Sequence, residues 1–424
     1  MSFHPLVRPP RFFVADLLLF LIVFAHSGLA FAEINDSIFS FKGFGTLAIT
    51  GTDTDALGFR RDTSTGHGAN KSWSIPTDSR LGLQIDAHFN DDFSATAQWV
   101  LRDRSGQFFE QNLDLAFLRW DVSPELFIRL GRVSPDVFML TDHRNVGYAY
   151  PWMRPPHEFY GQIPIYHYDG LDITHKLALH GGFLTVKLFG GYTHNQISSF
   201  VENETIEQGG TIFSGSAVYM KGDWTSRLSY SQFEVTHDSS DLNLLRQTLT
   251  NPAVNLVWPG VQSLAPRIQT IGTIARFSEI GAAYDDGIWL AQAEASYIDT
   301  DSPFFPSMAS GYFSLGRRFS SLTLYGLLGI GKSLNSKTNI PQLLFPDPNL
   351  VVAQKSLDQA LNNNIDEKSL SLGLRWDFST NMALKLQWSH FWLGRNGTQN
   401  WITNPQQSAP EEVNVFSTGI DFVF

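Results

Sequence analysis

Three histidines lie close to carboxylates in the middle of the sequence, a combination that in other proteins binds metals or transfers protons. They are His143, His157 and His167, near Asp142, Glu158 and Asp169. A catalytic or metal site also needs convergent geometry, which sequence spacing alone does not provide. No His-Glu-x-x-His helix, nucleophile elbow or phosphate-cradling glycine loop is visible, and Asp53 and Asp55 lack the glycine and terminal glutamate of an EF-hand. We therefore predict no catalytic residue, no metal site and no cofactor.

Aromatic side chains are unusually dense in the segment 133–166, which also carries charges of both signs. The aromatic residues are Phe138, Tyr148, Tyr150, Trp152, Phe159, Tyr160 and Tyr166. The acids of the segment are Asp136, Asp142 and Glu158, and Arg132, Arg144 and Arg154 lie at or in it. Seven aromatic rings are too many for a freely solvated loop, so we expect the segment to pack against another part of the protein. Folding over a mouth or against a neighbouring subunit is the alternative interpretation.

Composition limits the class of protein. Charged residues make up 17% of the 424 residues and aromatic residues 13%, whereas a soluble protein usually carries about 25% charged residues. Beyond the N-terminus no run approaches the ~20 apolar residues of a membrane-spanning helix. A hydrophobic content of 43% excludes disorder. The net charge of −11 argues against a nucleic-acid partner, and the absence of cysteine excludes disulfides and thiolate chemistry.

The N-terminus has the order of regions found in a secretory signal. Arg8 and Arg11 precede an apolar run at 17–25, and Ala30 and Ala32 supply small residues for cleavage. The apolar run is too short to cross a membrane, which argues against an uncleaved anchor. We predict a cleaved signal peptide over residues 1–32 and a single β-barrel domain over residues 33–424.

Alternation of apolar and polar residues with a period of two dominates the rest of the chain. In the clearest segment, Leu81, Leu83 and Ile85 alternate with Gln84 and Asp86. Because successive strand residues point to opposite faces, each such segment predicts a strand with one apolar face and one polar face. We count sixteen strands. They are predicted to begin near Phe39, Ser79, Phe93, Asn112, Leu126, His167, Phe183, Thr211, Trp224, Ile268, Ile288, Ser307, Leu322, Glu367, Met382 and Val413.

The connections between these strands alternate between tight turns and mostly long loops, which is typical of an outer-membrane barrel. Many aromatic residues stand beside the tight turns or at the chain end, where they would form a girdle at one membrane interface. They are Phe89, Phe93, Trp120, Trp224, Tyr284, Trp289, Phe319, Phe378 and Phe424. A soluble β-sandwich is disfavoured because its strands are usually shorter and its loop lengths need not alternate. We also predict short helices in two long loops, over 240–249 and 349–361.

Taken together, these features resemble a Gram-negative outer-membrane porin over the whole mature chain. The resemblance rests on the signal sequence, the sixteen strands, the long third loop and the C-terminal strand ending at Phe424. The segment 147–156 is also similar to segments of proteobacterial porins. The resemblance implies a homotrimer in contact with outer-membrane lipid and lipopolysaccharide. It also implies that the barrel-assembly machinery recognises the terminal strand through Phe416, Ile420, Phe422 and Phe424.

In porins the third loop enters the lumen and narrows it, and basic wall residues face acids of that loop. The resemblance therefore implies a pore constriction formed by Asp136, Asp142, Arg144, Tyr148, Tyr150, Trp152, Arg154, Glu158 and Tyr160. The basic wall would comprise Arg80, Arg102, Arg119, Arg129 and Arg132. Alternation directs Arg80 and Arg102 inward, whereas the phase of Arg119 and Arg129 is less clear. Because the charges of the loop nearly balance, the sequence leaves the ion preference open.

The function predicted from these features is passive diffusion of small hydrophilic solutes and ions through a water-filled channel, without enzymatic activity. One alternative is a channel that prefers a sugar or an organic acid, with the aromatic side chains of the third loop as a stacking track. A barrel hydrolase is the third interpretation.

Overall fold

The structure is a computed structural model that describes residues 38–104, 112–163, 165–198, 205–238, 240–302, 304–334, 337–345, 347–362, 364–404 and 406–424. The predicted signal peptide, with Ala30 and Ala32 at its cleavage site, lies outside the described residues. Its cleavage stays a prediction.

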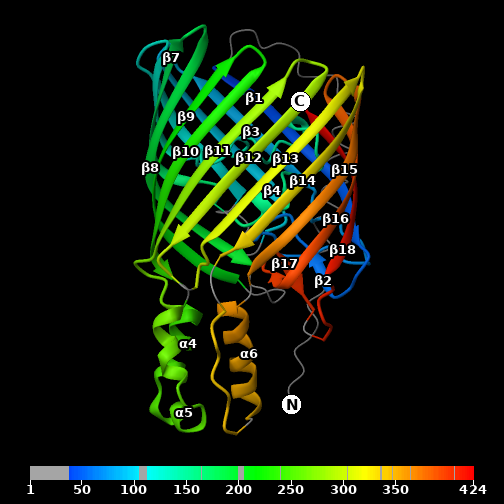
Figure 1. Cartoon of the computed structure of the whole chain (residues 1–424). Helices are drawn as coiled ribbons and strands as arrows, with labels where there is room; N and C mark the ends of the chain where they lie inside the picture. The colour runs from blue at the N-terminus through cyan, green and yellow to red at the C-terminus, as the bar shows by residue number, and fades with distance from the viewer. Residues whose placement is uncertain are drawn as a thin grey trace. The chain divides into compact units, whose positions relative to one another are not determined.

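Sixteen antiparallel strands form a closed barrel, as the alternation predicted (Figure 1). The strands are β1 (Phe39–Thr52), β3 (Arg80–His88), β4 (Phe93–Arg102), β5 (Leu113–Asp121), β6 (Leu126–Val133), β7 (Tyr168–Leu179), β8 (Gly182–Ser198), β9 (Thr205–Lys221), β10 (Trp224–Asp238), β11 (Ile274–Asp285), β12 (Trp289–Thr300), β13 (Met308–Phe319), β14 (Leu322–Ser333), β15 (Ile365–Ser379), β16 (Met382–Thr398) and β18 (Glu412–Val423). Each of these strands pairs with the barrel strands before and after it in sequence, and β18 pairs with β1 to close the barrel.

Two strand boundaries differ clearly from the prediction. The strand expected from Ile268 begins at Ile274, because residues Val261–Ile268 form a 3-10 helix, η2. The strand expected from Thr211 begins earlier, at Thr205, where a run of glycine and polar residues continues the pairing with β8. Apolar and polar residues alternate only weakly in both places. Where strands are held together by backbone hydrogen bonds without such alternation, the sequence does not show where the strand begins.

A second, two-stranded sheet was not predicted. It pairs β2 (Leu57–Phe59) in the first long loop with β17 (Trp401–Thr403) in the last. Phe59 and Trp401 are buried in a small apolar cluster with Phe391 and Val413. Three-residue strands are too short to show a periodic pattern, so the sequence carried no usable signal for this sheet.

The outer face of the barrel carries the apolar set of each alternating strand. Leu83, Leu118, Leu130 and Leu372 are exposed, whereas their polar neighbours in sequence turn inward. The aromatic residues beside the tight turns are exposed as well, apart from the half-buried Tyr284. Phe93 stacks with Trp120 across β4 and β5 at 6.1 Å between ring centroids. Within the described residues, no helix is both long and apolar enough to cross a membrane.

The tight hairpins use residues with left-handed backbone conformation. Gly222, between β9 and β10, has a φ of 56°, and Gly287, between β11 and β12, has a φ of 86°. Both glycines have open space where a Cβ would stand, so the positive φ and not crowding makes glycine the favourable residue there.

Two long loops form the predicted helices at the end of the barrel opposite these hairpins (Figure 1). The loop after β10 contains α4 (Ser240–Thr250), α5 (Pro252–Val257) and η2, and the loop after β14 contains α6 (Pro348–Asn362). They share an apolar core that includes Leu249, Trp258 and Leu357. The Trp258 indole donates to the carbonyl of Pro341 at 2.8 Å, which joins the two loops. We call this unit the helical cap.

Candidate pore constriction

The connection between β6 and β7, residues 134–167, contacts strands around most of the barrel. It contains the short helices η1 (Gly147–Ala149) and α3 (His157–Tyr160). Phe138, Trp152 and Phe159 of this third loop belong to one buried apolar cluster with Phe189 of β8 and Tyr312 of β13. Because these wall residues project inward from a closed barrel, the third loop lies in the barrel interior (Figure 1).

The first anchor of the third loop is Asp136, which lies between two cations of the wall. Its carboxylate oxygens lie 3.2 Å from the Lys187 Nζ and 2.9 Å from an Arg227 nitrogen. Ser216 donates to the same carboxylate at 2.7 Å. Burial favours a higher pKa for Asp136, but the charges of Lys187 and Arg227 hold the pKa below its usual value. The carboxylate is therefore ionised at neutral pH and fixes the start of the loop to β8, β9 and β10.

The second anchor is a buried lysine on the opposite side of the barrel. The ammonium group of Lys385, on β16, donates to the carbonyl oxygens of Gly147, Tyr150 and Trp152 at 2.6–2.7 Å. It also pairs with Asp421 of β18 at 2.7 Å. Lys385 is completely buried; the aspartate, these backbone dipoles and the Tyr150 ring 4.8 Å away stabilise its charge. The turn around η1 is thereby held against β16.

The third anchor joins the third loop to the first long loop. Arg154 forms a bidentate pair with Asp78 at 2.6 and 2.9 Å, and it also donates to Ser417 of β18. Burial favours a higher pKa for Asp78, but the arginine keeps the pKa below its usual value. A planar guanidinium that binds a carboxylate in this way fixes both position and orientation.

A buried acid pocket surrounds α3. Glu158 packs against the backbone of β14, where a Cβ on Gly329 would come within 2.4 Å of its carboxylate. Nearby, the Nδ1 atom of His157 lies 3.3 Å from Glu367, and the His157 ring is surrounded by Phe59, Phe391 and Trp401. Burial, followed by the charge of Glu367, raises the pKa of Glu158 to about 7. This part of the third loop is therefore sensitive to protonation near neutral pH.

One part of the third loop stays exposed. The Asp142 side chain is 47% exposed, and its carboxylate lies 3.3 Å from the Lys187 Nζ. Arg129, on the inward face of β6, pairs with Asp172 at 2.7 Å. The negative charge of Asp142 also attracts the Arg129 guanidinium. Further along this wall, Arg119 pairs with Asp121 at 2.5 Å, and about a third of each side chain is exposed. A strip of paired charges thus follows β5–β8 opposite the packed side of the loop.

The structure separates the five predicted wall arginines. Arg80 is buried and donates to the Asn145 carbonyl at 2.6 Å and to the Tyr150 hydroxyl at 3.0 Å. Arg102 is also buried and stacks on the Tyr166 ring, 3.2 Å from its centroid. These two residues hold the third loop in place, whereas Arg119 and Arg129 belong to the partly exposed strip.

Arg132 lies elsewhere. It lies two residues after Leu130, on the same strand face, and Leu130 is 58% exposed on the outer face. Arg132 also pairs with Asp169 of β7 at 2.8 Å. The guanidinium also donates to the carbonyl of Leu113. A residue that shares its strand face with an outward leucine does not project into the lumen.

Most of the predicted constriction residues are buried in the structure. Asp136, Arg144, Tyr150, Trp152, Arg154, Glu158 and Tyr160 are all buried, Tyr148 is partly buried, and Asp142 is exposed. Tyr160 and Tyr312 both donate to Glu294 of β12. Sequence reasoning missed Lys187, Arg227 and Lys385. It also missed Arg375 of β15, which donates to the Tyr148 carbonyl at 2.7 Å. The detectable signal was a cation on the polar face of a strand, but only the fold shows which segment it contacts.

A closed barrel of sixteen antiparallel strands with its third loop inside defines a porin-like protein. The sequence matches no protein-family model and no curated protein at a significant level. Among solved structures, the chain is similar to OmpF of Salmonella typhi in complex with daunomycin, with 14% identity, a TM-score of 0.52 and coverage of 91% of this chain and 97% of that chain. It is also similar to the anion-selective porin of Comamonas acidovorans, with 13% identity, a TM-score of 0.50 and coverage of 92% and 100%. At this identity the comparison establishes the fold alone.

Proposed function

We propose that the protein is an outer-membrane channel through which small hydrophilic solutes and ions diffuse passively. The observation that carries the proposal is the exposed carboxylate of Asp142, which pairs with Lys187 where the first anchor meets the charged wall strip. Paired charges along a lumen replace part of the hydration of a passing solute, and they tune selectivity without forming a binding site.

The arrangement supports a narrow channel. The third loop packs against β8–β15 through its apolar cluster and is hydrogen-bonded to β3, β16 and β18. The space for solutes therefore lies between the loop and the wall strip of β5–β8. Because Tyr150, Trp152, Phe159, Tyr160 and Tyr166 are buried in packing, their rings do not offer a stacking track. The geometry thus favours a narrow polar channel over a channel in which aromatic rings stack on a sugar or an organic acid.

Single-channel recording of the purified barrel in planar bilayers tests the proposal. Asp142→Asn should shift the reversal potential in a KCl gradient toward anion preference, because Lys187 and Arg129 lose a facing negative charge. Deleting part of the segment 148–160 should raise the conductance. The control, Asp301→Asn, removes an exposed acid that pairs with Arg276 outside the third loop and should change neither quantity. A folded barrel without ion conductance would overturn the proposal.

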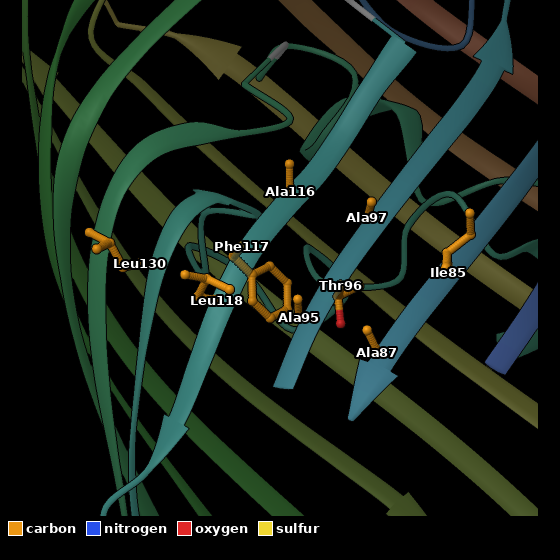
Figure 2. Close-up of a pocket in the computed structure, with 9 residues that line it drawn as sticks. All are labelled: Ile85, Ala87, Ala95, Thr96, Ala97, Ala116, Phe117, Leu118 and Leu130. Atoms are coloured by element: carbon orange, nitrogen blue, oxygen red, sulfur yellow. The ribbon is translucent and has the colours of Figure 1, made fainter. Parts of the chain in front are cut away.

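The barrel has one outer face that suits a second copy of the chain, and we include a homotrimer in the proposal. β3, β4, β5 and β6 contain 8–10 residues, whereas β7–β16 contain 12–17. Their outer face forms a groove of about 340 Å³. Figure 2 shows small side chains in it, among them Ala87, Ala95, Ala97 and Ala116. Small residues permit close approach between subunits in a membrane.

Ala95→Trp with Ala97→Trp should therefore dissociate the assembly, as read by native mass spectrometry. Ala291→Trp, on the corresponding face of β12, is the matched control and should leave the subunit number unchanged. A wild-type barrel that is monomeric in native mass spectrometry would remove the trimer from the proposal but would leave the channel intact.

Assembly of the barrel completes the proposal. Phe416, Ile420, Phe422 and Phe424 belong to the last strand or directly follow it, and Phe424 exchanges backbone hydrogen bonds with Gly43 of β1 at 2.8 and 3.0 Å. We propose that the barrel-assembly machinery recognises this terminal strand. Deleting Phe424 should reduce the heat-modifiable folded barrel in outer-membrane fractions while synthesis and export continue.

A further inference from the structure

Two histidines meet on one face of the barrel, over the strands β8, β9 and β10, which lie side by side (Figure 1). His194 lies on β8 and His237 lies on β10, and the centroids of their rings are 6.0 Å apart. Both side chains are exposed, and among the described residues neither imidazole has a hydrogen-bond or ion-pair partner. Their ring nitrogens are therefore available to a ligand.

A bulge in β10 turns His237 toward His194. Gly209 of β9 is opposite His194 on one side and opposite His237 on the other. The register of β10 shifts between Val235 and His237, whereas uninterrupted pairing would put Thr236 opposite Gly209. Residues that are opposite each other in a sheet share a face. The extra residue of the bulge thus re-aims His237 to the face that carries His194.

Gly209 leaves the space between the two rings open. Adjacent strands are about 4.8 Å apart, so the backbones of β8 and β10 are separated by roughly 10 Å with β9 between them. A Cβ built on Gly209 would lie 3.3 Å from the Nδ1 atom of His194, and it would also meet the Tyr192 hydroxyl. An imidazole nitrogen and a phenol oxygen therefore lie over the glycine, where a larger residue would keep the two rings apart.

The two histidines face outward at the edge of the membrane. Gly209 shares a strand face with Phe213, which is 62% exposed on the outer face of β9. From Leu184, beside the tight turn, to His194, β8 rises roughly 25 Å along the membrane normal, at about 3.3 Å per residue and a tilt near 40°. The apolar band of such a barrel is about 25 Å tall. His194 therefore lies at the outer edge of this band, where water and dissolved ions reach it.

The separation of the two rings fits one shared metal ion. An ion bound to an imidazole lies about 2.1 Å from the nitrogen and roughly 3.2 Å from the ring centroid. Two rings that share an ion therefore have centroids no more than about 6.4 Å apart, and the observed distance is 6.0 Å. Imidazole nitrogens suit Cu²⁺, Zn²⁺ and Ni²⁺, whereas Ca²⁺ and Mg²⁺ require oxygen ligands.

The charges around the two histidines favour a cation. Glu207 and Glu234 are exposed on the same outer face of β9 and β10. Arg276, on the neighbouring strand β11, is paired with Asp299 and Asp301, so its charge is compensated. A dication that approaches the histidines therefore meets a negative local field.

We propose that His194 and His237 bind one transition-metal dication, with Cu²⁺ bound more tightly than Zn²⁺ or Ni²⁺. Affinity for a nitrogen site rises along the first-row divalent ions to Cu²⁺ and falls again at Zn²⁺. Within the described residues, no group of three or more His, Cys, Asp and Glu side chains converges on a metal position. The Tyr192 hydroxyl and water therefore complete the coordination of the two imidazoles. The inference goes beyond the proposed channel function and does not rest on it.

Titration of the full barrel with Cu²⁺, in a neutral detergent and without a polyhistidine tag, tests the proposal. Calorimetry should reveal a site at which electron paramagnetic resonance detects two coordinated imidazoles. His194→Gln and His237→Gln should each weaken binding roughly tenfold or more and leave one coordinated imidazole. Gly209→Val should weaken binding as well, because its side chain fills the space between two intact histidines. Heat-modifiable migration in gel electrophoresis shows that each variant is folded.

A matched control separates this site from general binding to surface histidines. His175 is exposed on the same face of β7 as Ile173, which is 40% exposed on the outer face. His175→Gln should bind Cu²⁺ as the wild type does, and an excess of Ca²⁺ should not displace the bound Cu²⁺. Wild-type affinity in both His194→Gln and His237→Gln, an equal loss in His175→Gln, or displacement by Ca²⁺ would overturn the proposal.

Discussion

The third loop and the helical cap are both built from long connections, but they are stabilised in different ways. The third loop packs through an apolar cluster and is fixed in addition by buried ion pairs and by hydrogen bonds between wall side chains and its backbone, as at Asp136, Arg154 and Lys385. The helical cap is stabilised by an apolar core around Trp258 and Leu357. Apolar packing tolerates many arrangements, whereas a buried charge requires its partner at one position. The third loop thus has the more closely specified position.

The largest effect is expected when one partner of a loop anchor is removed. Asp136→Ala removes the carboxylate that Lys187 and Arg227 share, and leaves Asp142 and Glu279 as their remaining acidic partners. The loss should be about 3–5 kcal/mol, the usual cost of removing one partner from a buried ion pair. It should appear as a lower thermal unfolding midpoint and as a larger or fluctuating single-channel conductance. Asp301→Ala, at an exposed pair, should cost less than about 1 kcal/mol. Equal losses in both variants would contradict the difference between buried anchors and surface pairs.

A smaller effect is expected from pH. The pKa of Glu158 is raised to about 7 by burial and by the charge of Glu367, so the folded protein holds a proton that the unfolded chain has lost. The stability that depends on this proton is complete below the ordinary glutamate pKa and is lost as the pH rises through about 7. Loop protection in hydrogen exchange should therefore be higher at pH 5.5 than at pH 8.

Glu158→Gln removes this titration and should flatten the pH dependence of protection. An equal decline of protection with pH in the variant would assign the effect to another group. His143 is the control, because burial lowers its pKa and His143→Gln should leave the decline near neutral pH in place.

The smallest effect on transport is expected in the helical cap. Trp258→Ala should destabilise the cap locally by about 3–5 kcal/mol, since a fully buried aromatic side chain is lost. Proteolysis between α4 and η2 should become faster. Single-channel conductance should stay the same, because the cap has its own core. A change in conductance as large as that of Asp136→Ala would show that the two regions are coupled.

Much of the barrel could be predicted because its pattern is local. Alternation at Leu81–Asp86 or at Leu370–Phe378 indicates a strand and its two faces without any knowledge of the neighbouring strands. The helices 240–249 and 349–361 were likewise predicted from short segments, and the structure confirms them as α4 and α6.

The contacts of the third loop could not be predicted, because they join residues that are far apart in sequence. Alternation directs Arg80 inward, but nothing near Arg80 indicates that the Asn145 carbonyl and Tyr150 will cover it. The density of aromatic residues indicated packing, and the partners Phe189 and Tyr312 appear only when the barrel closes.

The seam between β1 and β18 has a consequence for the order in which the protein can be made. Gly43 and Phe424 exchange backbone hydrogen bonds, so β1 finds one of its two partners only in a strand that is made more than 350 residues later. Until then β1 has an unpaired edge, which is a template for association with other chains. Contacts this distant in sequence also make closure slow. Any chain that is interrupted before its final strand is therefore left with two open edges, and it depends on being held apart from its copies during the whole time of synthesis and export.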